Sequence, residues 1–133
     1  MEIWIFGNPD LPEDNLPIKL FPVLQKTYPQ HKFILQDPLD EWQMPEGLFI
    51  IDTIKGLDKV EVFESLEQFE KTPNVTMHDY DLLTNLAFLK KLGKLPKFKI
   101  FGLPPDLGLD EALNQLKLKL DPTLSASAEN LEH

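Results

Sequence analysis

The chain has 133 residues, the usual size of one compact domain, and its 42% apolar content is that of an ordinary globular protein. Its 22 acidic and 13 basic side chains give a formal charge of −9, which repels phosphate backbones and anionic lipid. Nucleic acid and membrane surfaces are therefore poor partners. The sequence has no cysteine, which excludes disulfides and thiolate metal sites and fits a reducing cytoplasm.

Neither a signal peptide nor a membrane span is expected. The apolar run Ile3–Phe6 meets Asn8-Pro9 too soon for a signal peptide, and no apolar run is long enough to cross a bilayer. We expect a single α/β domain over residues 1–120 and a loose, polar tail over residues 121–133. The end of that tail, Leu131-Glu132-His133, is typical of an expression-tag scar.

The first half of the chain alternates strand and helix signals. Ile3–Phe6 ends at a turn, as a buried strand does. Asn15 is placed to cap a helix with apolar residues at helical spacing, in which Pro22 predicts a kink. Strands are then predicted at Lys32–Leu35 and Leu48–Ile51. The second of these is uniformly apolar, as in a parallel strand covered on both faces.

The second half continues this alternation. Val60–Phe63 alternates apolar and acidic residues, which is typical of a half-exposed edge strand. Tyr80–Leu92 is predicted to be a helix with a leucine stripe, and Gly93 stands where a left-handed C-terminal residue is favoured. Phe98–Phe101 is predicted to be a strand and Asp110–Leu120 a helix.

Strands that alternate with helices predict an α/β fold. We expect a mostly parallel, twisted sheet of about five strands with helices on both faces, a three-layer sandwich of the phosphorylase/hydrolase-like kind. The strands at Ile3, Leu48 and Phe98 should be central, and that at Val60 should lie on an edge. Ligands of such sheets bind beyond the carboxyl ends of the strands.

That rule selects three places for a functional site. The loop Gly7–Asn15 follows the first strand, Asp52 follows the strand Leu48–Ile51, and His78 precedes the helix Tyr80–Leu92. Two carboxylates and one imidazole suit a divalent metal such as nickel or zinc. Each place also has a structural interpretation, because acids and histidines often serve only as turn or cap residues.

Four short motifs follow one another in the same order as these places. They read Gly7-Asn8-Pro9-Asp10-Leu11-Pro12-Glu13-Asp14-Asn15-Leu16-Pro17, then Leu48-Phe49-Ile50-Ile51-Asp52 with Gly56, then Val75-Thr76-Met77-His78, then Lys99-Ile100-Phe101-Gly102-Leu103-Pro104. In this order and spacing they resemble the hydrogenase maturation protease family, from Ile3 to about Leu120. That family has G-N-x-L-x-x-D-(D/E)-G-x-G after its first strand and closes with I-x-G-I-x-P.

The resemblance implies an enzyme, a nickel-dependent endopeptidase of the cytoplasm. Its substrate would be the precursor of a nickel–iron hydrogenase large subunit, whose C-terminal extension is removed. The residues of this family that contact the metal fall on Asp14, Asp52 and His78, which are thus the implied catalytic and metal-contacting residues. The nickel would be carried by the substrate rather than bound tightly in the resting protein.

The chain departs from the family pattern in its first motif. Asn15 and Pro17 stand where the family has glycines, and Asp10 where it has leucine. Asparagine tolerates left-handed backbone, so we expect Asn15 to preserve that turn. The lost glycines favour an alternative, a non-catalytic nickel-sensing chaperone or binding module on the same fold. An unrelated small α/β binding domain would require the order of the motifs to be chance.

Overall fold

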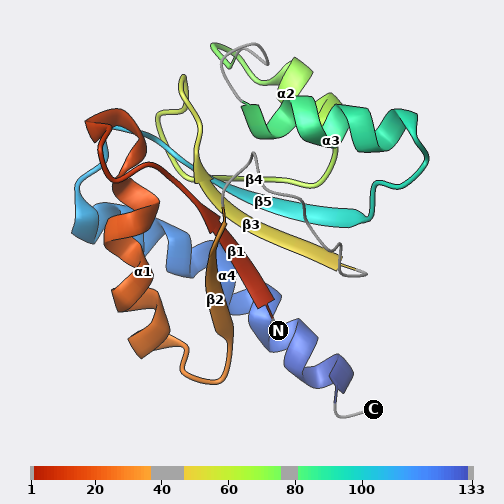
Figure 1. The fold of residues 1–133 in the computed structure, drawn as a ribbon. Helices are drawn as coiled ribbons and strands as arrows, with labels where there is room; N and C mark the ends of the chain where they lie inside the picture. Colours follow the sequence, from red (N-terminus) through yellow and green to blue (C-terminus); the bar gives the residue numbers. More distant parts are fainter. Residues whose placement is uncertain (1, 37–46, 76–80, 132–133) are drawn as a thin grey trace.

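The computed structural model describes residues 2–36, 47–75 and 81–131 (Figure 1). Ten elements follow one another along the chain: β1 (Glu2–Phe6), the 3-10 helix η1 (Pro12–Asp14), α1 (Leu16–Thr27), β2 (Lys32–Gln36), β3 (Gly47–Thr53), β4 (Glu61–Phe63), α2 (Leu66–Lys71), α3 (Asp81–Lys91), β5 (Lys97–Leu103) and α4 (Leu109–Leu131). Within these ranges no helix is both long and apolar enough to span a membrane.

The five strands form one sheet in the order β2-β1-β3-β5-β4. All neighbouring strands are parallel except β4, which runs antiparallel to β5 at the edge. The predicted α/β class is therefore confirmed, as is the placement of the strands around Ile3, Leu48 and Phe98 inside the sheet. The chain leaves β1 for β2 on one side and returns to β3 on the other, so the topology switches between β1 and β3.

Helices cover both faces of the sheet, α1 and α4 on one and α2 and α3 on the other (Figure 1). Alternate residues of each strand therefore face different layers. In β1, Ile3 and Ile5 pack with α1 and α4, whereas Trp4 and Phe6 pack with α2 and α3. All four side chains are buried, which explains the uniformly apolar run.

Helix α1 differs from its prediction in two details. Asn15 occupies the N-cap position but makes no side-chain capping hydrogen bond. Pro22 lies on the exposed side, and the helix is continuous from Leu16 to Thr27 around it. Leu20 and Leu24, on either side of the proline, are fully buried, and their packing holds the helix where the lost backbone bond would weaken it.

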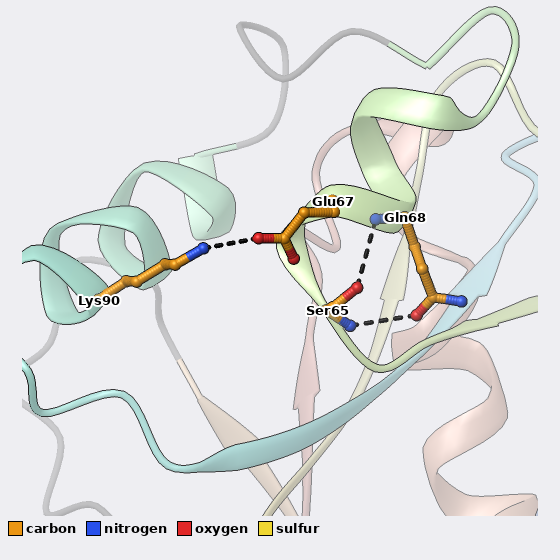
Figure 2. A network of polar contacts seen from close by, with 4 residues as sticks. All are labelled: Ser65, Glu67, Gln68 and Lys90. Carbon is orange, nitrogen blue, oxygen red and sulfur yellow. Dashed lines mark hydrogen bonds and ion pairs between the residues drawn. The ribbon is translucent and has the colours of Figure 1, made fainter.

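Helix α2 was not predicted (Figure 2). It has a capping box, in which the Gln68 N–H donates to Ser65 Oγ at 3.4 Å and the Ser65 N–H donates to Gln68 Oε1 at 3.1 Å. Lys90 of α3 donates to Glu67 of α2 at 2.8 Å, and this hydrogen bond lowers the pKa of Glu67 and raises that of Lys90. Both side chains are exposed, so the pair orients the two helices more than it stabilises them.

Helix α4 extends well beyond the predicted end at Leu120. It continues through Pro122 to Leu131, so the expectation of a loose tail from Asp121 is wrong over residues 121–131. Leu124 continues the apolar stripe one turn after Leu120 and is buried at 4% exposure. The Tyr28 hydroxyl, just after α1, donates to the Asp121 carboxylate and joins the two helices of this layer.

Candidate active site at the topological switch point

The loop after β1 folds back on the end of the strand. The Asn8 N–H donates to the backbone carbonyl of Asp14 at 2.8 Å, and the Asp10 N–H donates to the Asn8 side-chain oxygen at 3.0 Å. A Cβ atom at Gly7 would lie 3.0 Å from the Asp14 carbonyl oxygen, a tight contact that favours glycine here. Gly7 and Asn8 thus hold Asp14 beside the carboxyl end of β1.

Asp52 lies at the equivalent end of β3. We expected it directly after the strand, but pairing with β5 continues to Thr53 and Leu103, so Asp52 is the penultimate residue of β3. It is buried at 6% exposure and lies opposite Gly102 of β5. A Cβ atom at Gly102 would meet the Ile54 side chain at 2.6 Å, so the glycine leaves room for this side chain, which comes directly after β3.

Thr53 joins the two acidic residues. Its hydroxyl donates to Asp14 Oδ1, and its N–H donates to Asp52 Oδ1 at 2.8 Å. Thr53 is itself buried at 8% exposure, and Asp14 is half-buried. The end of β3 and the segment after β1 are therefore brought together at the switch point. Thr53 did not appear among the predicted site residues, because no motif in the sequence marks it.

His78 lies in the segment 76–80, outside the described residues. The residues that precede this segment, Asn74 and Val75, pack closely against Gly56. A Cβ atom at Gly56 would lie 2.0 Å from the Asn74 carbonyl oxygen and 3.3 Å from the Val75 nitrogen. Within the described ranges, no group of three or more His, Asp or Glu side chains is arranged to hold a metal ion. Of the three predicted site residues, Asp14 and Asp52 lie within the described ranges.

Asn15 and Pro17 stand at the two positions where the resembled motif has glycine, and neither has a positive φ. Asn15 has φ of −102°, so the expected left-handed turn at this residue is wrong. Pro17 is buried in the first turn of α1, where a missing N–H is not needed. In the described residues, positive φ occurs at Gly56, Asn74 and Gly93. The backbone that follows Asp14 therefore needs no glycine at either position.

A comparison with solved structures matches this chain to the hydrogenase maturating endopeptidase HybD from E. coli. The match has a TM-score of 0.63 over 98% of this chain and 94% of that chain, at 18% sequence identity. The chain has the HybD fold. The resemblance seen in the ordered motifs is thereby confirmed at the level of architecture. No family model matches the sequence, and neither does any curated protein.

Proposed function

We propose that this protein is a hydrogenase maturation protease, an endopeptidase that removes the C-terminal extension of an immature nickel–iron hydrogenase large subunit. One observation carries the proposal. Thr53 links Asp14 and Asp52, the two acids selected by the motif resemblance, at the switch point of a HybD fold. In open α/β sheets this is where ligands bind. We place the reaction in the cytoplasm.

In the proposed reaction the nickel arrives as part of the substrate. Asp14, Asp52 and His78 supply oxygen and imidazole donors, which complement a nickel ion already held by substrate thiolates. This contact anchors the scissile segment beside the two carboxylates. A carboxylate there accepts a proton from water as the water attacks the peptide carbonyl, and the proton then passes to the leaving amine. The resting protein should hold metal weakly, because three such donors leave coordination positions unfilled.

The placement of Val75 supports the inclusion of His78. Val75 lies against Gly56, which is in the loop directly after β3 and four residues after Asp52. An extended chain spans at most about 3.6 Å per residue, so the three steps from Val75 to His78 cover no more than about 11 Å. The covalent chain thus ties His78 to the loop after β3, and this connection supports its inclusion in the proposed site.

The alternative is a non-catalytic nickel-sensing module on the same fold, which the replaced glycines at Asn15 and Pro17 favour. Incubation with nickel-loaded and with nickel-free precursor separates the two functions. Cleavage of the loaded form alone supports the protease, and tight binding without cleavage supports the module. Asp52→Asn should abolish cleavage. Asp10→Asn, at an exposed acid of the loop that also carries Asp14, is the matched control and should leave it unchanged.

A further inference from the structure

A groove runs along the open edge of the sheet at β4 and is lined by residues of β4, α2 and α4. The two helices lie on opposite faces of the sheet (Figure 1). It encloses about 750 Å³, within the range of small-ligand and peptide sites. Its lining comes from all three elements and from the two residues before β4, and includes Lys59, Val62, Lys71, Gln115, Leu118 and Lys119. We call this cavity the β4 groove.

The charge of the β4 groove is opposite to that of the protein. Three lysines and one acid, Glu61, line it, whereas the whole chain has 13 basic and 22 acidic side chains. Lys59, Lys71 and Lys119 are exposed, and the ion pairs found in the described part of the chain involve other lysines. A local excess of unpaired positive charge on an acidic protein favours an acidic ligand.

The backbone of β4 is also available along this groove. Strand β4 pairs only with β5, so its other side has no strand neighbour in the described structure. The Val60 N–H donates to Gln115 Oε1 of α4 at 2.9 Å, and therefore points away from β5. Backbone groups two residues apart in a strand point the same way, so the Val62 N–H faces the groove. Leu118 adds an apolar surface that is 74% exposed.

We propose that the β4 groove binds an extended acidic segment of a partner protein, which pairs with β4 as a sixth strand. Backbone hydrogen bonds to the Val62 region provide affinity in this mode of recognition, and side chains provide specificity. Successive side chains of the added strand alternate between the two walls. Acidic residues on it therefore meet Lys71 on the α2 wall or Lys119 on the α4 wall, and apolar residues meet Leu118.

The start of β4 lies in the same row of the sheet as the candidate active site. Asp52 of β3 pairs with Gly102 of β5, and Gly102 pairs with Glu61 of β4, so the three residues form one row across the sheet. Neighbouring strands are about 4.8 Å apart, which places the backbone of Glu61, at the start of β4, about 10 Å from that of Asp52. The assignment of the bound segment to the hydrogenase precursor rests on the proposed function, whereas the binding of an acidic strand does not.

The test uses the full chain and a short, end-blocked peptide of alternating glutamate and valine, with no nickel and no precursor. We expect binding that weakens as salt rises, and a chemical-shift change at the Val62 amide in nuclear magnetic resonance spectra. The double variant Lys71→Glu/Lys119→Glu should weaken binding by about tenfold or more. Lys26→Glu/Lys32→Glu, the same charge change at exposed residues of α1 and β2, should change it by less than about twofold.

Four outcomes would overturn the inference. These are no binding of the glutamate–valine peptide, equal binding of a lysine–valine peptide, an unmoved Val62 amide, and unchanged affinity in Lys71→Glu/Lys119→Glu. Self-association of the protein through this edge, detected by sedimentation and lost in Val62→Pro, would identify a second copy as the occupant and also contradict it. The cleavage assay of the proposed function is a separate experiment, so either proposal can fail alone.

Discussion

The Thr53 hydroxyl donates to the carboxylate of Asp14, a residue 39 positions earlier, while the Thr53 N–H donates to Asp52. One buried residue therefore contacts an acid of its own strand, Asp52, and an acid of the segment after β1, Asp14. The orientation of Asp14 depends on β3 as well as on its own loop. Because Thr53 lies in a paired strand, the arrangement rests on the rigid part of the fold.

Replacing Thr53 by valine keeps its shape and removes the hydroxyl. Asp14 Oδ1 then loses this donor, and we expect a loss of about 1–2 kcal/mol in the free energy of unfolding, measured in urea. On the proposed function, cleavage of nickel-loaded precursor should fall by about tenfold or more, because Asp14 is no longer held in place. Thr53→Ser restores the hydroxyl and should recover most of the activity. Full activity in Thr53→Val would show that Thr53 positions nothing.

His78→Ala tests the residue that the motif resemblance assigns to the site. We expect it to abolish precursor cleavage and to leave the melting temperature nearly unchanged, because a ligand to the substrate's metal contributes little to folding. A surface or cap histidine would leave cleavage intact, whereas a core histidine would lower the melting temperature by several degrees. Purified protein with stoichiometric, chelator-resistant zinc or nickel would contradict the view that the metal arrives with the substrate.

Gly56→Ala should strongly destabilise the fold. Gly56 has φ of 101°, and a Cβ atom there would overlap the Asn74 carbonyl oxygen at 2.0 Å. We expect a loss of about 3 kcal/mol or more in urea unfolding. Gly93→Ala is the matched control, since its φ of 71° is also positive but nothing lies within 4 Å of the added atom. It should cost about 1 kcal/mol. Equal losses in the two variants would mean that the contact with Asn74 is unimportant.

The Tyr28–Asp121 hydrogen bond predicts a dependence of stability on alkaline pH. Burial, and then the hydrogen bond to Asp121 and its charge, raise the pKa of Tyr28 above the ordinary value of about 10. The folded protein therefore keeps a proton that the unfolded chain loses, and stability should fall as pH rises above about 10. Tyr28→Phe should cost about 1 kcal/mol at neutral pH and flatten this decline. Urea midpoints from about pH 8 to about pH 11 measure it, and parallel declines would contradict the assignment.

Much of the architecture followed from apolar runs alone. Ile3–Phe6 and Leu48–Ile51 contain only apolar residues, and Phe98–Phe101 has Lys99 as its one polar residue. Helices cover both faces of these strands, so the apolar runs are easily recognised. Helix α2 has only six residues, too few for a periodic pattern, and its one signal is the Ser65/Gln68 capping box. The extension of α4 was missed because Pro122 resembles a helix stop, whereas the burial of Leu124 maintains the helix.

The site was less predictable than the fold. The rule that ligands bind beyond the carboxyl ends of strands selected the loop Gly7–Asn15 and Asp52. The family resemblance then selected Asp14 within that loop. Thr53 could not be found in this way, since its role depends on the direction of one hydroxyl across 39 positions of sequence. The positive φ at Asn74 was equally hidden, because it follows from the approach of Gly56 in a different loop.

The backbone at Asn15 and Pro17 has a consequence for the unfolded chain. A glycine at either position would give the unfolded chain more conformations to lose on folding, a difference of about 0.4–1 kcal/mol per residue. Neither residue needs the positive φ that would justify glycine, since Asn15 has φ of −102° and Pro17 lies in the first turn of α1. The first motif of this chain is therefore a stiffened version of the loop, with lower entropy before folding and less freedom to adapt afterwards.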